Sequence, residues 1–402
     1  MKRREAIALV AGAVGTLPGS LRPRAVPAQS PSPTPTSPPV NVLEFEPLAK
    51  QRLPREVWEY ISQGAADELT LRRNREAFDA IRLRPRVLVD VSRIDTRLEL
   101  FGQKLEFPIL LAPVAGQGRV HTRAEPEAAR GASAAGATFV ISTFASSRVD
   151  EIVRAARGRA WFQLYVQRDR GVTKDLVQRA EAAGCTALCI TVDGPVVPMR
   201  DREKRLGIRP PYSGASRGGR VSPLYADAID STVTWETVAW IRSFAKTPVL
   251  IKGILAPDDA RRAAAEGLAG VIVSNHGGRN LDTTPATIDA LPTVVEAAGD
   301  RMAILLDGGV RRGTDVLKAI ALGARAVLIG RGRRAHRHAR YDFAHHHHGL
   351  LSATALVRPE SRRPIVQVRT RRFAVPRAIS RRGCQHHRGT GRGRARYRDR
   401  RR

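Results

Sequence analysis

The side chains best suited to chemistry in this sequence each follow an apolar run. His276 and Asp193 are the first pair, since an imidazole oriented by a carboxylate can act as a general base. Arg200 and Arg279 carry the planar fork that grips a carboxylate through two hydrogen bonds. Lys252 can neutralise an anion that develops nearby. Together these residues predict the removal of a proton or a hydride next to a substrate carboxylate.

Two segments rich in glycine and arginine indicate a phosphate site. Asp307-Gly308-Gly309-Val310-Arg311-Arg312 and Gly330-Arg331 follow the last two apolar runs. Glycine lets the backbone approach a ligand closely, and exposed N–H groups together with arginine bind a phosphate dianion. The dinucleotide fingerprint is missing, because Gly116-Gln117-Gly118 lacks the third glycine. The expected ligand is therefore a mononucleotide rather than NAD.

Eight apolar runs must position these side chains. They span residues 109–112, 138–141, 161–166, 187–192, 249–251, 270–273, 303–306 and 326–329. Helical stretches separate most of them, among them 125–135, 173–183, 257–266 and 313–322. Continuous apolar strands that alternate with helices form parallel sheets buried on both faces, and eight such units are the count of a (β/α)8 barrel.

Polar or small residues end almost every predicted strand, and barrel enzymes keep their chemistry at that end. Gln163 and Tyr165 share one face of the third strand because they are two residues apart. The other candidates at strand ends are Pro113, Ala115, Ser142 and Thr191. Such a ring predicts one ligand-binding mouth. Residues 195–234, rich in Gly, Pro and Arg, are expected to form a mobile excursion above it.

The first 28 residues have the pattern of an export signal. Lys2-Arg3-Arg4 is a basic head, and Ala6–Leu17 is apolar but too short to span a membrane. Val26-Pro27-Ala28 offers a cleavage point. The paired arginines favour the twin-arginine route and a periplasmic location, whereas an ordinary basic N-terminus would leave the protein cytoplasmic. Residues 29–42 are predicted to be a Pro-rich linker, and residues 43–82 have a helical pattern.

The C-terminal segment, residues 332–402, differs in composition from the rest. It holds 21 Arg, no Lys and three acidic residues, a net charge of +18 out of +30 for the whole chain. This charge excess predicts a disordered tail or one translated out of frame. It also puts closure of the barrel after its eighth strand in doubt. A basic tail can bind anionic surfaces, but its few aromatic side chains argue against nucleic acid.

The two cysteines in the barrel region, Cys185 and Cys189, flank the start of the fourth predicted strand. Four residues of extended chain span about 13 Å, which is too far for a disulfide. A C-x3-C pair without other ligands nearby is a poor zinc motif, so no metal site is expected. Both cysteines are predicted to take part in the packing of the barrel.

Two motifs carry a resemblance to a known family. They are SNHGGRNLD at 274–282 and DGGVRRG at 307–313, supported by short stretches at 84–86, 112–113, 162–165 and 191–193. The chain resembles the FMN-dependent α-hydroxy-acid oxidases and dehydrogenases, which include glycolate oxidase, lactate oxidase and mandelate dehydrogenase, from about residue 45 to residue 331. The resemblance implies a TIM barrel, bound FMN, a homo-oligomer, and oxidation of a small L-2-hydroxy acid to the 2-oxo acid.

The resemblance also implies roles for individual residues. His276 matches the base, Asp193 its partner, Lys252 the cation beside the flavin N1/O2 edge, and Tyr165 the tyrosine near the substrate hydroxyl. The residues implied to hold the substrate carboxylate are Tyr60, Arg200 and Arg279. Those implied to contact FMN are Pro113, Ala115, Ser142, Gln163, Thr191, Lys252, Asp307, Gly309, Arg311, Gly330 and Arg331.

Several alternatives stay open at this point. His276 takes either the hydroxyl proton during hydride transfer or the α-proton in a carbanion route, and the electron acceptor is oxygen or a quinone or cytochrome partner. Phe144 stands where glycolate oxidase has tryptophan, which leaves the substrate side chain open. The competing interpretations are another FMN- or phosphate-binding barrel enzyme, such as an isomerase, and a catalytically impaired family member with a basic tail. The isomerase gives no reason for two carboxylate-binding arginines.

Overall fold

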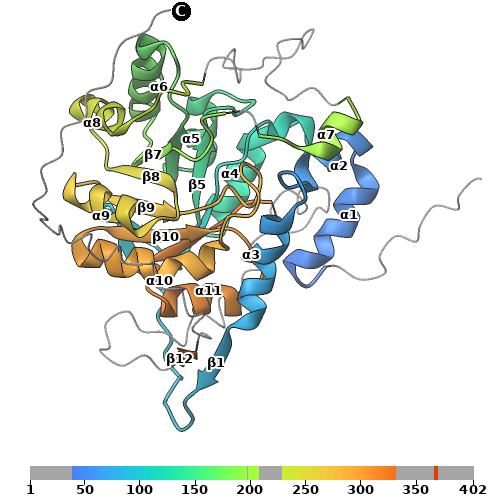
Figure 1. Ribbon diagram of the computed structural model, residues 1–402, viewed down its shortest axis with the longest axis vertical. Helices are drawn as coiled ribbons and strands as arrows, with labels where there is room; N and C mark the ends of the chain where they lie inside the picture. The colour runs from blue at the N-terminus through green and yellow to red at the C-terminus, as the bar shows by residue number, and fades with distance from the viewer. Residues whose placement is uncertain (1–38, 197, 208–228, 332–365, 370–402) are drawn as a thin grey trace, which may run out of the picture. The chain divides into compact units, whose positions relative to one another are not determined.

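Eight parallel strands form a closed barrel in the computed structural model, which describes residues 39–196, 198–207, 229–331 and 366–369 (Figure 1). The barrel strands are β4 (Ile109–Leu111), β5 (Thr138–Ser142), β6 (Ala160–Leu164), β7 (Leu188–Thr191), β8 (Val249–Ile254), β9 (Gly270–Val273), β10 (Ala303–Asp307) and β11 (Ala326–Ile329). Each of the eight predicted strands is confirmed, and so is the (β/α)8 architecture.

Helices lie outside the ring of strands (Figure 1). They are α4 (Ala124–Ala134), α5 (Val149–Ala155), α6 (Arg170–Ala182), α8 (Trp235–Phe244), α9 (Pro257–Ala265), α10 (Thr287–Ala298) and α11 (Gly313–Ala321). Local signals set where they begin: Asp169 accepts hydrogen bonds from the first turn of α6, and Thr234 starts α8 with a capping box. The four helical stretches predicted between strands are confirmed as α4, α6, α9 and α11.

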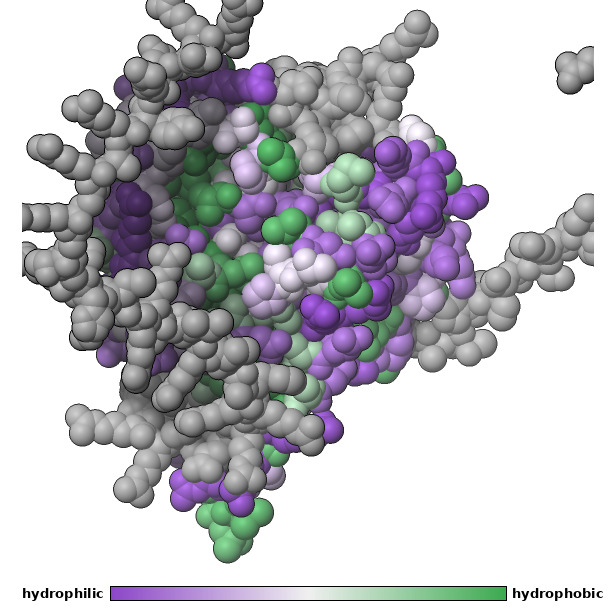
Figure 2. All heavy atoms as spheres, in the orientation of Figure 1, coloured by the Kyte–Doolittle hydropathy of each residue, from purple (hydrophilic) through white to green (hydrophobic). Residues whose placement is uncertain are grey.

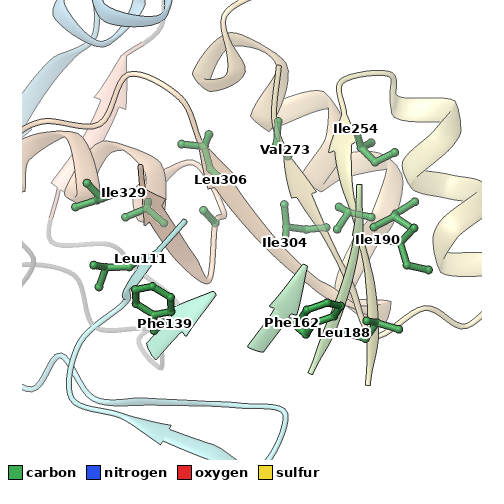
Figure 3. Packing of buried hydrophobic residues seen from close by; sticks show 14 of the residues in the cluster. Leu111, Phe139, Phe162, Leu188, Ile190, Ile254, Val273, Ile304, Leu306 and Ile329 are labelled. Atoms are coloured by element: carbon green, nitrogen blue, oxygen red, sulfur yellow. The ribbon is translucent and has the colours of Figure 1, made fainter. Parts of the chain in front are cut away.

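The alternation of side chains along each strand separates two apolar clusters. In β4, Ile109 and Leu111 belong to the cluster between strands and helices, whereas Leu110 belongs to the cluster inside the barrel. The outer cluster joins side chains from most strands, as the labelled residues of Figure 3 show. The inner cluster surrounds Trp161, which is fully buried. The barrel is therefore a packed core rather than a channel.

A hairpin that the sequence analysis did not predict packs against the inner cluster. It consists of β2 (Leu98–Leu100) and β3 (Gln103–Leu105), joined by Phe101 and Gly102. Both turn residues have positive φ, which is the geometry of a tight hairpin turn. Leu100 and Leu105 are buried against the interior side chains, and Gln103 Oε1 accepts a hydrogen bond from Trp161 Nε1 at 3.2 Å. The hairpin thus covers the amino-terminal end of the barrel.

The sequence puts closure of the barrel in doubt, but the structure shows that the ring of strands is closed. β11 pairs with β4 through Val327 opposite Ile109 and Ile329 opposite Leu111. Both strands precede Arg331, so the ring of hydrogen bonds needs no residue from the C-terminal segment. The outward side chains of these strands are buried, with Ile109 only 1% and Ile329 8% exposed.

Four residues of the C-terminal segment are described as a strand. β12 (Val366–Arg369) pairs antiparallel with β1 (Arg82–Pro85). The rest of that segment, on which the predictions of disorder and of an out-of-frame tail depend, lies outside the described residues. The loop that follows β1 exposes Val87, Leu88 and neighbouring apolar side chains, and it forms the apolar tip at the lower end of Figure 2.

The N-terminal helical prediction is confirmed. A short 3-10 helix, η1 (Val42–Glu44), leads into α1 (Phe45–Arg52), α2 (Arg55–Ser62) and α3 (Leu69–Ala80). The predicted export signal and most of the predicted linker lie outside the described residues. In the described part of the chain, no helix combines the length and apolar character needed to cross a membrane.

The packing of Cys185 and Cys189 leads to a chemical prediction. Both are buried free thiols, Cys185 in the outer cluster and Cys189 inside the barrel, and burial raises the pKa of each to about 12. We expect neither thiol to react with iodoacetamide at pH 8 in the folded protein, and both to react in denaturant. Peptide mass mapping checks this, and rapid native labelling of either cysteine would show that the barrel packing is wrong.

Candidate active site

One pocket opens at the carboxyl ends of the barrel strands. Every site residue predicted from the sequence lines it except Asp193, which lies behind His276. The predicted residues that line it are Tyr60, Pro113, Ala115, Ser142, Gln163, Tyr165, Thr191, Arg200, Lys252, His276, Arg279, Asp307, Gly309, Arg311, Gly330 and Arg331. The ring of strand ends inferred from the sequence is therefore a single site.

His276 lies in a line of hydrogen bonds between Asp193 and Tyr165. Its Nδ1 is 2.8 Å from Asp193 Oδ1, and its Nε2 is 3.1 Å from the Tyr165 hydroxyl. An ionised Asp193 accepts a hydrogen bond from Nδ1–H, so in the neutral imidazole Nε2 is the nitrogen without a proton, and it faces the pocket. Burial, and next the charge of Asp193, raises the pKa of Tyr165, so its phenol stays protonated and donates to Nε2.

The backbone around His276 is held in an unusual conformation. His276, Gly277 and Gly278 all have positive φ, which is costly for histidine and easy for glycine. The His276 N–H donates to Ser274 Oγ at 3.1 Å, and the Gly278 N–H to the Asn275 backbone oxygen at 2.9 Å. This turn aims the imidazole at the barrel mouth, and a strained conformation of this kind is typical of functional sites.

The position of Asp193 is set by two neighbours, Gly253 and Asn280. Gly253 in β8 has φ +113°, and a Cβ there would come within 2.5 Å of Asp193 Cβ. Asn280 Nδ2 donates to the Asp193 backbone oxygen at 2.8 Å. Burial would raise the pKa of Asp193, but the charges of His276 and Lys252 outweigh burial and lower it. The side chain is therefore a carboxylate near neutral pH.

Lys252 forms a buried charge cluster with two carboxylates. Its Nζ is 3.1 Å from Asp307 Oδ2 and donates to Ser274 Oγ at 2.7 Å. Burial alone would lower the pKa of Lys252, but the charges of Asp307 and Asp193 raise it. The lysine therefore remains a cation at the bottom of the pocket, and its hydrogen bond to Ser274 ties it to the His276 turn.

The arginines predicted to bind a carboxylate converge on one wall of the pocket. Arg279 Nη1 donates to the Gln63 backbone oxygen at 2.8 Å, and its guanidinium carbon lies 5.3 Å from the centre of the Tyr60 ring. Arg200 is 9% exposed, with Nη1 3.2 Å from Glu203 Oε1. The Arg200 side chain is also tied to the Arg279 backbone, because Arg200 Nε donates to the Arg279 backbone oxygen at 3.3 Å. This wall is the positively charged end of the pocket.

Two further arginines stand at the ends of β10 and β11. Arg331 donates to the backbone oxygens of Gln63 and Gly277, and Arg311 donates to the Val310 oxygen. Burial lowers the pKa of both, because no carboxylate among the described residues forms an ion pair with either. A guanidinium stays charged in proteins, so an anion placed between these residues would relieve the cost of burial.

The same pocket also contains buried polar atoms without partners among the described residues. Gln163 Nε2 and Asp307 Oδ1 have none, although their residues are only 2% and 7% exposed. Buried polar groups are normally hydrogen-bonded, so these atoms mark places where a polar ligand fits. Gly308 and Gly309 both have positive φ, and their backbone lies in the lining of the same pocket.

Comparison with known proteins identifies the family. The model of FMN-dependent dehydrogenases matches residues 49–340. The chain is 46% identical to glycolate oxidase 1 of Oryza sativa subsp. indica over 305 residues, covering 72% of this chain and 83% of that protein. The chain belongs to the FMN-dependent dehydrogenase family.

Other members of the FMN-dependent dehydrogenase family give the same result. An L-lactate oxidase of Nostoc sp. is 42% identical over 319 residues, covering 74% of this chain and 87% of that protein. A crystal structure of mandelate oxidase superimposes with a TM-score of 0.73 at 37% identity, covering 79% of this chain and 92% of that one. The chain is therefore an FMN-dependent oxidoreductase of the α-hydroxy-acid oxidase type, as its motifs predicted.

The pocket residues fit FMN. The uncompensated guanidinium groups of Arg311 and Arg331, with the glycine turn at Gly309, suit a phosphate. The unpartnered Asp307 Oδ1 can accept from a ribityl hydroxyl, and Gln163 Nε2 can donate to a ring oxygen or nitrogen. These atoms lie in one continuous pocket with Lys252 and His276.

The structure adds residues that sequence reasoning missed. The Gln63 backbone oxygen accepts from both Arg279 and Arg331, and its side chain donates to Glu203 at 2.5 Å. The exposed Arg119 places its guanidinium carbon 5.5 Å from the centre of the Tyr60 ring. A backbone oxygen, and a contact between α2 and a 3-10 helix far along the chain (Gln117–Arg119), leave no motif in a sequence. The one partial signal is Arg119 itself, a cation that follows the glycines at 116 and 118.

The close approach of Gly253 to Asp193 predicts a specific defect. Gly253→Ala combines a left-handed backbone with a clash, whereas Gly158→Ala, at φ +75° with no atom within 4 Å of the added methyl, suffers only the former. We expect Gly253→Ala to slow flavin reduction by substrate by about 100-fold, since small misplacements of reacting groups have that cost. Rapid mixing without oxygen measures it. Equal rates in the two variants would show that Gly253 does not place Asp193.

Proposed function

We propose that this enzyme oxidises a small L-2-hydroxy acid, of about the size of glycolate or lactate, to the 2-oxo acid. The observation that carries the proposal is the orientation of His276. Its basic Nε2 faces a pocket whose wall holds Arg200 and Arg279. A base and a carboxylate clamp within one pocket suit a substrate whose reacting carbon bears a carboxylate. The names of the related glycolate and lactate oxidases support the same substrate class.

The arginine wall binds and orients the substrate. Arg279 and Arg200 present planar forks that form paired hydrogen bonds with a carboxylate, and Tyr60 stands beside Arg279 in the pocket lining. Fixing the carboxylate leaves the adjacent carbon and its hydroxyl facing His276 and Tyr165. Orientation of this kind contributes to the rate because it replaces a random encounter with a fixed geometry.

His276 accepts the proton that the oxidation releases. Nε2 takes it, and the resulting imidazolium is stabilised by Asp193 at 2.8 Å from Nδ1. Tyr165, which already contacts Nε2, can donate its hydrogen bond to the substrate oxygen. Bound FMN supplies the two-electron acceptor. Lys252 is a fixed, buried cation in the lining of the pocket, and it would offset negative charge on a reduced cofactor held there.

The pocket wall near Tyr165 favours a small substrate side chain. The Phe144 ring stacks on Tyr165 with 5.2 Å between ring centres, and both residues line the pocket. Two packed aromatic rings at this wall leave less room for a large substituent than small side chains would.

Reoxidation of the reduced enzyme in air-saturated buffer, compared with reoxidation by a quinone or a cytochrome, identifies the electron acceptor.

Replacing His276 tests the assignment of the base. In His276→Ala we expect FMN to remain bound, because the phosphate-binding groups are elsewhere. Flavin reduction by L-lactate or glycolate should slow by about 10²–10⁴-fold, the usual contribution of a general base. Stopped-flow absorbance under anaerobic conditions is the measurement. The matched control is His121→Ala, the other histidine of the described residues, which lies outside the pocket lining. Reduction of the His276 variant at the wild-type rate would refute the role.

Replacing Arg279 tests the carboxylate clamp. Arg279→Lys keeps a positive charge but loses the fork, so substrate affinity should fall by about 10–100-fold, the value of one charge-assisted hydrogen bond. The rate constant of reduction at saturating substrate should fall less. Arg202→Lys is the control, because Arg202 pairs with Glu59 and Glu68 outside the pocket. Unchanged affinity in Arg279→Lys would mean that the carboxylate binds elsewhere.

A further inference from the structure

Helix α3 touches both of the turns that carry the site. A Cβ at Gly278, in the His276 turn, would lie 2.6 Å from the Leu71 nitrogen. A Cβ at Gly309, in the turn predicted to bind phosphate, would lie 2.0 Å from the Asn74 oxygen. Both glycines are therefore required by the close approach of one helix. The start of that helix is also tied to the His276 side, because Asp282 accepts hydrogen bonds from Leu69 and Thr70 N–H at 3.2 and 2.7 Å.

A buried amide pair links α3 to the residue before His276. Asn74 Nδ2 donates to Asn275 Oδ1 at 2.9 Å, and Asn275 Nδ2 donates back to Asn74 Oδ1 at 2.8 Å. Asn275 Oδ1 also accepts from the Gly278 N–H, and Asn74 Oδ1 from the Thr287 N–H. The two side chains are 2% and 5% exposed. A fully bonded buried network of this kind fixes the backbone to which it is attached.

The next residue of α3 holds the other turn. Arg75 Nη1 donates to the Gly309 oxygen at 2.9 Å, and the guanidinium pairs with both oxygens of Asp315 at 2.5 and 2.9 Å. The same carboxylate accepts from the N–H groups of Arg311 and Arg312, each at 2.9 Å. Arg75 thus fixes the backbone of Arg311, one of the two pocket arginines whose guanidinium forms no ion pair with a carboxylate among the described residues.

We propose that α3 couples flavin binding to the placement of the catalytic base. Asn74 is a positioning residue for His276, and Arg75 is a positioning residue for the phosphate turn. Because these residues are adjacent on one rigid helix, order imposed on the turn at Gly309 by FMN is transmitted to the turn at His276. The role of His276 rests on the function proposed above, whereas the mechanical link rests only on the contacts of α3.

Hydrogen exchange on the full chain, without and with FMN, tests the link. In wild-type protein FMN should slow exchange in peptides covering both 307–313 and 274–282. In Asn74→Ala we expect FMN to bind within about threefold of the wild-type Kd and to protect 307–313, while protection of 274–282 is lost. Flavin reduction by substrate should then fall by about tenfold or more, since the base is no longer fixed.

Arg75 gives the complementary result. Arg75→Ala should raise the Kd for FMN, measured by quenching of flavin fluorescence, by about tenfold or more, and Arg75→Lys should restore part of the affinity. The matched control is Arg73→Ala, an exposed residue of the same helix, which should behave as wild type in both measurements. If Asn74→Ala is unfolded by circular dichroism, Asn74→Ser, which keeps a hydroxyl, is compared in its place.

The outcomes separate this proposal from the proposed function. Protection of 274–282 by FMN that persists in the Asn74 variant, or wild-type FMN affinity in Arg75→Ala, would overturn the coupling. Neither measurement needs a substrate. Suppose that protection is lost in the Asn74 variant but that no hydroxy acid reduces the flavin of the wild-type protein. The coupling would then stand, and only the proposed function would be refuted.

Discussion

The hydrogen bond between His276 Nδ1 and Asp193 is the interaction on which the site depends. It decides which imidazole nitrogen is basic, and it places a half-buried carboxylate where a positive imidazolium can form. The molecule supports this bond at several points. Gly253 leaves room for Asp193, Asn280 holds the Asp193 backbone, and the left-handed turn at His276 aims the ring.

The charges of the barrel mouth are arranged around that pair. Lys252 pairs with Asp307, and the nearby charge of Asp193 also favours its charged form. Arginines stand at both ends of the pocket, Arg311 and Arg331 at one and Arg200 and Arg279 at the other. Positive charge at both ends, with His276 between, suits a phosphate at one end and a substrate carboxylate at the other.

The sequence predicted the barrel and most of the site because both depend on local patterns. Continuous apolar runs such as Gly270–Val273 specify buried parallel strands, and the polar residue after each run must lie at the mouth. The hairpin at Phe101-Gly102 was missed because it lacks the usual Asn-Gly signal. The contacts of Gln63 and of Asn74 were missed because they join segments far apart in the chain. The composition after Arg331 does not predict whether the barrel closes, because closure depends on the pairing of β11 with β4, and both strands precede that residue.

The central claim is that Asp193 makes His276 a base by fixing its tautomer. Asp193→Asn tests it most directly, because the amide keeps the size of the side chain but loses the charge. Anaerobic rapid mixing of the FMN-loaded variant with L-lactate or glycolate measures the rate constant of flavin reduction. We expect a fall of about 10³–10⁴-fold with FMN still bound. A rate constant within tenfold of the wild-type value would contradict it.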